Sequence, residues 1–453
     1  MHVQGRWSIC TCLLLLAQIF QVHAINLNID DQQSFKDAAS DATYGMMKWY
    51  SGNETGAIPG AFPSKWWEGA ALFLALLNYW HFTGDDTYND ELKVGLQWQS
   101  GTEGDYMPSN YSSYLGNDDQ MFWGLAAMTA AELKLPNMPT GFSWLSLAQG
   151  VFNTQKDRWE TSMCDGGLRW QLYVYQGSGY YLKNAVSNGG FFQLAARLAR
   201  YTNDDQYLKW ARKAWDWSCS VPLVNNKTWE VSDSTNGENQ CNNGDHTQWT
   251  YNYGIYMMGA AYMYSHTNES SWLDAVNGLL NTTLDKFFDN KIMSEVTCEP
   301  SEKCNSNEIL FKGLESSWLA FTALLIPSTS ARILPYLQSS AAGAAASCTG
   351  NNNNTCGVRW LQSKWDGWTG MEEQISASNL FSANMLRWVN DSNYSPVTAS
   401  TGGNSSGDVN AGMGDTQDTV KPMTTGQKAG GGILTVIFFF ASVGMGSFLI
   451  MGG

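Results

Sequence analysis

One pattern recurs along the chain and constrains its fold more than any other feature: an apolar helical stretch, a short turn and a second helical stretch. The turn is written as Thr, then Gly or Asn, then an acid at 83–85, 202–204 and 267–269. Gly or Asn tolerates the left-handed backbone that ends a helix, and an acid or Ser can cap the next helix. Each of these turns therefore predicts one helical hairpin.

Helical stretches without the turn motif keep the same spacing, at about 121–133, 314–325 and 371–389. The turns then recur with a period of roughly 50–65 residues, which corresponds to six hairpins. The sequence shows no convincing run of alternating apolar and polar residues that would predict long strands. We predict an all-α protein, an (α/α)6 toroid of six helical hairpins. The alternative is an open α-solenoid, in which the terminal repeats cap the ends.

Both ends of the chain differ from this pattern. Residues 1–24 hold a short apolar run followed by a small-x-small sequence, which is typical of a secretory signal peptide. Residues 433–453 are apolar with no Lys or Arg after them, which favours a removed GPI-attachment signal over a membrane span. Residues 396–432 are rich in Gly, Ser, Thr and Asn and predict a disordered stalk that includes the attachment region. We expect one folded domain at 25–395, anchored to the outer face of the plasma membrane.

The composition excludes some functions. A formal net charge of −15 argues against nucleic acid, because phosphate binding needs a basic surface. Two of the nine cysteines lie before residue 25, which leaves seven, an odd number. Cys298 and Cys304 are close enough to close a small loop, as are Cys348 and Cys356, but the full connectivity stays open. Without a CxxC motif, and with five His residues, the chain predicts no metal site and no cofactor.

The folded region contains three Asp-Asp pairs, at 85–86, 118–119 and 204–205. Acidic residues are favoured in the first turn of any helix by its free N–H groups and its dipole. The pairs at 85–86 and 204–205 lie in hairpin turns, and their position in the repeat accounts for them. Asp118-Asp119 instead begins an inner helix, on the opposite face of the ring, where the starts of the other inner helices should form a cleft.

Two carboxylates at the start of a buried helix suit the cleavage of a glycosidic bond. One can ionise and attack the anomeric carbon, while the other keeps a proton because burial and its charged neighbour raise its pKa. Neighbouring helical side chains can place two carboxyls about 5–5.5 Å apart, the spacing of a retaining glycosidase. We therefore predict that Asp118 and Asp119 are the catalytic pair.

The residues around this pair resemble a known family. The run Leu-Gly-Asn-Asp-Asp-Gln-Met-Phe-Trp-Gly at 115–124 is similar to the signature of glycoside hydrolase family 76. Further similar segments are Asp-Tyr-Met-Pro at 105–108, Gly-Gly-Leu-Arg-Trp-Gln at 166–171, Ser-Asn-Gly at 187–189, Gly-Ala-Ala-Tyr-Met-Tyr at 259–264, and Cys298-Glu299 with Cys304-Asn305. The resemblance runs in order from about 30 to 390.

The resemblance implies an (α/α)6 fold and a retaining mechanism, with Asp118 as nucleophile and Asp119 as general acid/base. It is strongest to the fungal, GPI-anchored mannan endo-1,6-alpha-mannosidases of the cell wall. That branch implies action on alpha-1,6-linked mannose: alpha-1,6-mannan or the GPI core glycan would be the donor, and cell-wall glucan the acceptor of a transglycosylation. The family pattern has no cysteine at 219, which implies a Cys164–Cys241 disulfide and an unpaired Cys219.

Other side chains are expected on the cleft face. The candidates for substrate binding are Trp66, Trp67, Gln120, Asn188, Trp249, Tyr251 and Lys312. Aromatic rings can stack against the C–H faces of sugars, although core packing is the favoured alternative for each ring alone, and less so for Trp66 and Trp67. Asn188 can bind a mannose hydroxyl or cap its helix. Lys312 can bind hydroxyls or the phosphoethanolamine of a GPI anchor, or it can be paired internally.

Two other classes of protein compete with the enzyme. One is a non-catalytic cell-surface protein that binds mannan or GPI glycan, and the other is a structural wall protein. The intact Asp118-Asp119 pair favours the enzyme, and the absence of adhesin-like tandem repeats disfavours the structural protein. The sequence does not separate hydrolysis from transfer, because both proceed through the same glycosyl-enzyme intermediate.

Overall fold

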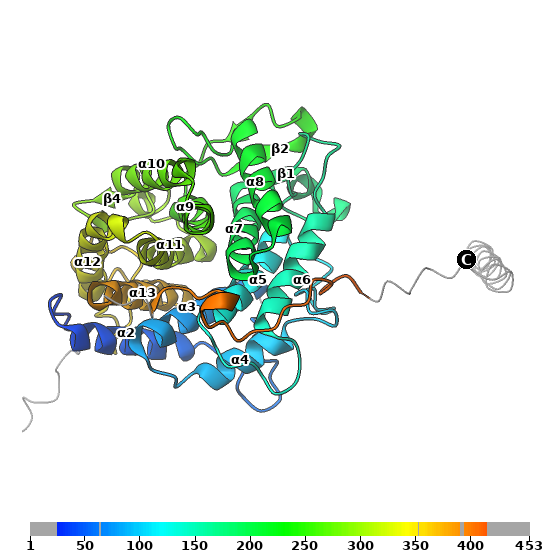
Figure 1. Ribbon diagram of the computed structural model, residues 1–453. Coiled ribbons are helices and arrows are strands. Elements are labelled where there is room, and N and C mark those ends of the chain that lie inside the picture. Colours follow the sequence, from blue (N-terminus) through cyan, green and yellow to red (C-terminus); the bar gives the residue numbers. More distant parts are fainter. Residues whose placement is uncertain (1–24, 63–64, 352, 390–393, 415–453) are drawn as a thin grey trace, which may run out of the picture. The chain divides into compact units, whose positions relative to one another are not determined.

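The computed structural model describes residues 25–62, 65–351, 353–389 and 394–414. In these residues, long helices form two concentric rings (Figure 1). The inner helices are α3 (Trp66–Thr83), α5 (Asn117–Glu132), α7 (Ala185–Thr202), α9 (Thr250–Thr267), α11 (Ser306–Leu325) and α13 (Met371–Ala383). The outer helices are α2 (Gln32–Met47), α4 (Asn89–Trp98), α6 (Trp144–Asp157), α8 (Asp205–Ser220), α10 (Ser270–Lys286) and α12 (Ser330–Ser347).

The inner ring is closed. Its helices pack in chain order, from α3 against α5 through to α11 against α13, and α13 then packs back against α3. The first helix, α2, packs on α13, so the sixth hairpin is assembled from the two ends of the domain. The predicted (α/α)6 toroid is therefore confirmed, and the open solenoid is wrong. The toroid belongs to the first of two compact units, residues 1–412.

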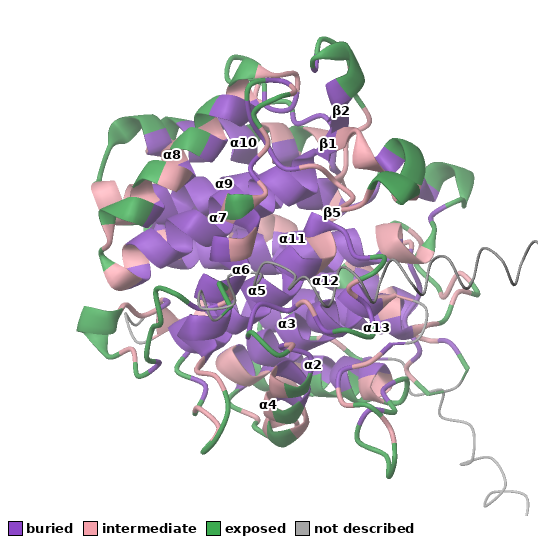
Figure 2. Ribbon diagram, turned by 90° about the vertical axis from the view of Figure 1, so that its right-hand side faces the viewer, coloured by how far each residue is buried: buried purple, intermediate pink, exposed green. Residues whose placement is uncertain are grey.

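The two rings differ in how much of each helix is buried (Figure 2). The inner helix α3 buries sixteen of its eighteen residues, whereas the outer helix α8 buries five of sixteen. An inner helix touches neighbours on every side, while an outer helix needs an apolar stripe on one side only. This difference explains why the inner helices read as continuous apolar runs in the sequence.

The predicted left-handed helix stop is present at all three motif turns, whereas a side chain of the motif caps the next helix at only one of them. Gly84, Asn203 and Asn268 each end an inner helix in the left-handed conformation, with φ of 79°, 57° and 56°. The Asp204 carboxylate then accepts a hydrogen bond from the backbone N–H of Gln206 and caps α8. The local sequence thus stops one helix and starts the next.

Short strands lie in the longer loops. The strands β1 (Leu182–Asn184), β2 (Ser234–Asn236) and β3 (Gly244–Asp245) form one antiparallel sheet in that order. A second sheet pairs β4 (Phe288–Asp289) with β5 (Ile292–Met293). The strand β1 leads directly into α7, so the first sheet lies at the N-terminal end of an inner helix and brings the residues around 233 beside it.

The segment that follows residue 396 is packed against the toroid, which corrects the predicted domain boundary. This segment is orange in Figure 1. Val397 N–H donates to the Glu132 carbonyl, and Leu145 N–H donates to the Ser405 hydroxyl. The domain thus extends beyond 395, and the prediction of a disordered stalk is wrong for its first part. The predicted signal peptide, the rest of the stalk and the GPI signal lie outside the described residues. Among the described helices, none is long and apolar enough to cross a membrane.

The described residues contain three disulfides, and they are the ones expected. Cys164 pairs with Cys241, Cys298 with Cys304, and Cys348 with Cys356, while Cys219 carries a free thiol. The Cys164–Cys241 bond has the greatest reach, because it joins residues 77 apart. It ties the loop before β1 to the loop that connects β2 and β3. This bond holds the first sheet in place at the end of α7.

Candidate active site

A cleft of about 380 Å³ opens where the inner helices begin, on the face that the sequence predicts. It is lined by Lys65, Trp66, Trp67, Tyr114, Leu115, Asp118, Asp119, Phe122, Trp170, Gln171, Leu182, Asn184, Val186, Asp233, Ser234, Tyr251, Asn307 and Phe311. The first residues of α3, α5, α7, α9 and α11 all contribute. Asp118 and Asp119 are the only adjacent pair of carboxylates among these lining residues.

The pair is held by the first turn of α5. Gly116 is the N-cap, and its N–H donates to the Asp119 carboxylate at 2.6 Å. The N–H of Asp119 donates to Oδ1 of Asp118 at 3.0 Å. Asn117 N–H donates to the Trp170 carbonyl at 2.9 Å, which fastens the start of the helix to the loop opposite. Both carboxylates are therefore oriented by backbone groups and remain half-buried in the cleft.

Glycine is the only residue type that leaves room for the Asp118 carboxylate at position 116. A Cβ at this residue would lie 2.3 Å from Oδ1 of Asp118 and 3.0 Å from the Trp170 carbonyl oxygen. The backbone itself is extended, with φ of −96°, so any residue could adopt its conformation. The glycine is thus needed for space beside Asp118.

Both carboxylates hold their protons to a higher pH than an ordinary aspartate does. Burial raises the pKa of both groups, and the charge of Asp119 raises that of Asp118 further. Hydrogen bonds oppose the shift, from the Gly116 N–H to Asp119 and from the Asn184 side chain to Asp118. A pair with one proton holds one group that can attack and one that can donate a proton, which is what retention requires.

Asn184 and Asp233 are among the polar groups of the cleft that the sequence analysis missed. Asn184 ends β1, accepts a hydrogen bond from Ser187 N–H at 3.3 Å and so caps α7, and its side chain also bonds to Asp118. Asp233 precedes β2, and burial together with the charge of Asp245 raises its pKa to about 6. Both residues come from the loops between hairpins. An Asn three residues before Ser187 is a readable helix cap, whereas nothing in the sequence singles out Asp233.

Three of the predicted aromatic residues line the cleft. Trp66 Nε1 donates to the Gln99 side chain at 2.7 Å, and Trp67 Nε1 donates to the Asn307 side chain at 3.1 Å. The Tyr251 ring stacks on Phe311 with the ring centroids 3.7 Å apart and the planes at 5°. Each ring is therefore held by a neighbour and forms a rigid wall of the cleft.

Gln120 and Asn188 do not line the cleft, which corrects their predicted role in substrate contact. The Gln120 amide donates to the Asp105 carbonyl at 2.7 Å, and the side chain is fully buried. The Asn188 amide bonds both backbone groups of Leu168, at 2.8 Å and 3.0 Å. Successive helical residues point about 100° apart, so neighbours of a cleft residue turn into the core.

Lys312 and Trp249 are also placed away from the cleft. The Lys312 ammonium is 2.6 Å from the Glu299 carboxylate and donates to the Val358 carbonyl at 2.6 Å, so the internally paired interpretation is the correct one. Trp249 packs beside the Cys298–Cys304 disulfide, with its edge toward Phe311. Neither side chain lines the cleft.

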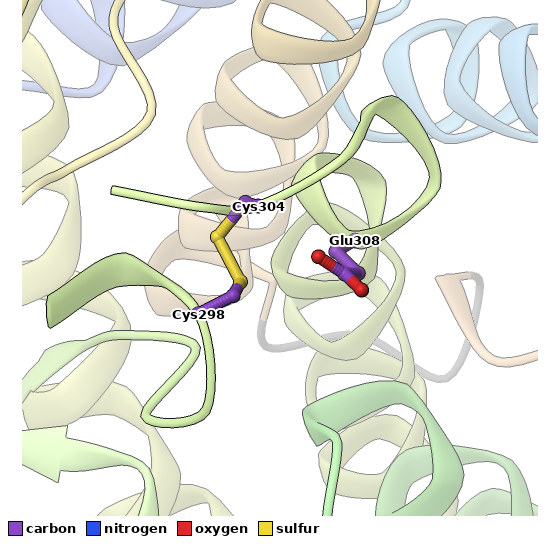
Figure 3. Close-up of side chains that lie close together, drawn as sticks. All are labelled: Cys298, Cys304 and Glu308. Carbon is purple, nitrogen blue, oxygen red and sulfur yellow. A yellow bond between two sulfur atoms is a disulfide. The ribbon is translucent and has the colours of Figure 1, made fainter. Parts of the chain in front are cut away.

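One group of potential metal ligands also proves structural. Cys298, Cys304 and Glu308 lie close together (Figure 3). The two sulfur atoms are joined as a disulfide, so neither offers a thiolate to a metal. Glu308 accepts the Asn305 N–H at 2.8 Å in the capping box of α11. These three residues hold the start of an inner helix.

A carboxylate pair in a cleft is the arrangement that glycoside hydrolases use, and here it lies at the helix starts of a closed (α/α)6 toroid. The family model of glycosyl hydrolase family 76 matches residues 34–399. The chain belongs to this family. It is 40% identical to the mannan endo-1,6-alpha-mannosidase DCW1 of Saccharomyces cerevisiae, over 94% of this chain and 96% of that protein.

Solved structures agree with the fold. The chain is similar to Dfg5 from Chaetomium thermophilum, solved with glucosamine, with a TM-score of 0.81, 38% identity, and coverage of 86% of this chain and 98% of that one. It is also similar in fold to an alpha-1,6-mannanase of Salegentibacter sp. HEL1_6, with a TM-score of 0.62, 18% identity, and coverage of 78% and 99%. The latter is an inactive variant with two consecutive aspartates replaced, in complex with alpha-1,6-mannotriose.

Proposed function

We propose that the protein cleaves chains of alpha-1,6-linked mannose with retention of configuration, and that Asp118 and Asp119 perform the reaction. The carboxylate pair in an aromatic-walled cleft carries this proposal. The relatives named as mannan endo-1,6-alpha-mannosidases support the substrate class. The Salegentibacter protein, which is inactive without two consecutive aspartates, supports the use of an adjacent pair.

In the first step, Asp119 donates its proton to the glycosidic oxygen while Asp118 attacks the anomeric carbon. The leaving sugar departs as an alcohol, and a glycosyl ester on Asp118 remains. In the second step, Asp119 takes a proton from the acceptor, whose oxygen attacks the same carbon and releases Asp118. These roles require the shared proton to lie on Asp119 when the substrate is bound. In the free protein, burial and the charge of Asp119 raise the pKa of Asp118 well above its usual range, so the proposal requires the proton to move to Asp119 as the substrate binds; the hydrogen bond from Asn184 favours that direction.

The aromatic wall accounts for binding. The rings of Trp66, Trp67 and Tyr251 are fixed by their neighbours, so they lose little freedom when a sugar stacks on them. Asp233 and Asn184 add polar groups to the same cleft, where mannose hydroxyls need partners. We infer that these residues, together with the aromatic wall, position the scissile bond against the carboxylate pair.

The acceptor decides between hydrolysis and transfer. We propose that the donor is the mannan core of a GPI anchor and that cell-wall glucan is the acceptor, so that the reaction joins a GPI protein to the wall. The apolar segments at 1–24 and 433–453 support a site of action at the outer face of the plasma membrane, with attachment through a GPI anchor. The competing function is a surface protein that binds mannan without turnover.

The test uses alpha-1,6-mannohexaose and three variants. Asp118→Asn is expected to lower kcat by at least a thousandfold, because no glycosyl ester can form. Asp119→Ala is expected to keep turnover on substrates with an activated leaving group and to be accelerated by azide. Asp205→Asn, in an exposed pair at a hairpin turn, is the matched control and should leave kcat unchanged. Undiminished turnover by Asp118→Asn, or binding without turnover by the wild type, overturns the proposal.

A second measurement concerns the acceptor. Mass spectrometry of the products, in the presence of beta-glucan oligosaccharides, is expected to show mannose chains joined to glucan. Products that contain only free mannan fragments contradict the transfer proposal, and the proposal of a hydrolase then stands alone.

A further inference from the structure

A patch of exposed aromatic and apolar side chains lies at the rim of the cleft. Tyr175 is 70% exposed and Val174 is 63% exposed, the two largest values among the large hydrophobic side chains of the described residues. Tyr114, at 52%, belongs to the same rim and also lines the cleft. A soluble protein leaves such rings in water at a cost, so a patch beside an active site indicates a binding surface.

The rings are held in place by their surroundings. Tyr173 and Tyr175 stack in parallel, with centroids 5.2 Å apart and planes at 6°. The Tyr175 hydroxyl donates to the carbonyl of Ser113, the residue before Tyr114. One face of the Tyr175 ring is thus backed by a second ring, and the side chain is mostly open to solvent. A rigid ring of this kind binds with little loss of conformational entropy.

The patch is continuous with the cleft. The Gln176 amide donates to the Tyr114 carbonyl at 3.0 Å and to the Gln171 side chain, a cleft residue, at 2.5 Å. Gly179, in the 3-10 helix η1 (Val174–Tyr180), lies directly against the Trp170 ring, where a Cβ would be 3.1 Å from a ring carbon. The segment that carries Tyr173 and Tyr175 therefore packs against Trp170 and Gln171 from the solvent side.

We propose that Tyr114, Tyr173 and Tyr175 form an outer sugar platform, a binding site for a neutral glycan chain that continues beyond the cleft. The inference rests on the proposed function, because it needs a glycan in the cleft. The three tyrosines present ring faces and hydroxyls without any charge, which suits neutral sugar units. The continuity with Trp170 and Gln171 places the platform on the path of a chain that leaves the cleft.

The glycan on the outer sugar platform has two possible sources: the continuing mannan donor or the glucan acceptor. Both expose C–H faces to the rings, so the experiment compares them. Calorimetry on the full folded protein carrying Asp118→Asn measures the affinity for alpha-1,6-mannotriose, alpha-1,6-mannohexaose and a beta-1,3-glucan hexaose, with and without Tyr175→Ala. Tyr44→Ala, a similarly exposed tyrosine on the outer helix α2, is the matched control.

Tyr175→Ala is expected to weaken one of the two hexaoses about 5- to 10-fold, as loss of one aromatic contact does, and to leave the triose within twofold. The hexaose that responds identifies the source. In the active protein the same change should raise KM for the long chain whose affinity falls, at unchanged kcat, and Tyr175→Phe, which keeps the ring, should restore it. An equal effect on triose and hexaose, or no effect on either hexaose, overturns the platform.

Two further outcomes separate a glycan site from a membrane surface, and the platform from the catalytic roles. Binding of uncharged lipid vesicles that is lost in Tyr175→Ala, without any change in glycan affinity, shows a membrane surface and overturns the inference. Turnover that survives in Asp118→Asn overturns the proposed catalytic roles alone, because the dependence of KM on chain length can still be measured in the active protein.

Discussion

Replacing Gly116 by Ala tests whether the active site depends on space beside Asp118, the proposed nucleophile. The new Cβ would lie 2.3 Å from Oδ1 of Asp118, whereas an ordinary contact between carbon and oxygen needs about 3.4 Å. The carboxylate therefore has to move by about 1 Å, and it loses the hydrogen bond from Asp119 N–H. A misplacement of about 1 Å costs about a hundredfold in rate when a reaction depends on orientation. We expect kcat/KM on alpha-1,6-mannohexaose to fall by about that factor.

The fold should tolerate this change. The φ of −96° at Gly116 suits any residue, and the closest atom is the end of a side chain that can turn away, while the Trp170 carbonyl oxygen at 3.0 Å has to give by a few tenths of an ångström. Alanine is a poorer N-cap than glycine, so we expect a loss of stability of up to about 1 kcal/mol. Urea unfolding measures this loss, and steady-state kinetics measures the activity.

Gly84→Ala is the matched control. Gly84 ends α3 with φ of 79°, and a Cβ there meets nothing within 4 Å. This variant should lose about 1 kcal/mol of stability through backbone strain and keep its kcat/KM. The reasoning is refuted if Gly116→Ala retains kcat/KM within threefold of the wild type, or if both variants lose activity in proportion to stability.

Two other predictions concern charge. The pH profile of kcat/KM should be bell-shaped, and its acid limb should lie above the pH of about 4 expected of an ordinary aspartate. Burial raises both pKa values of the Asp118–Asp119 pair. The proposed nucleophile is therefore already protonated at mildly acidic pH, and the proposed acid loses its proton only at higher pH. An acid limb near pH 4 contradicts this. Arg197→Met should cost about 3–5 kcal/mol in urea unfolding, because it leaves Glu132 buried without its 2.6 Å ion pair. Arg212→Met, at an exposed pair, should cost at most about 1 kcal/mol.

Much of the site could be predicted because its position follows from local rules. Helix starts and stops depend on caps and on apolar runs, both of which are written in consecutive residues. Once the hairpins are counted, the starts of the inner helices must share one face, and that places Asp118 and Asp119 in the cleft. The same rule places Trp66 and Trp67 there, at the start of another inner helix.

The direction in which a side chain points from its helix could not be predicted in the same way. Asp118 and Asp119 line the cleft, while Gln120, one residue later, turns into the core toward α6. Lys312 directly follows the cleft residue Phe311 in the inner helix α11, but its side chain is paired with Glu299 inside the protein. A rotation of about 100° per residue separates these outcomes, and only packing against neighbours determines the angle.

Residues of the loops between hairpins show the same limit more strongly. Asn184 and Asp233 are 49 positions apart, yet the sheet of β1 and β2 brings both to one cleft. The segment at 396–412 looks like a polar linker in sequence, but hydrogen bonds to α6 and its neighbours hold it on the toroid. The sequence by itself determined the number of hairpins, the face of the cleft and the carboxylate pair, because each follows from short-range periodicity and capping. The tertiary structure alone decided which polar groups surround the pair, because that depends on contacts between segments far apart in the chain.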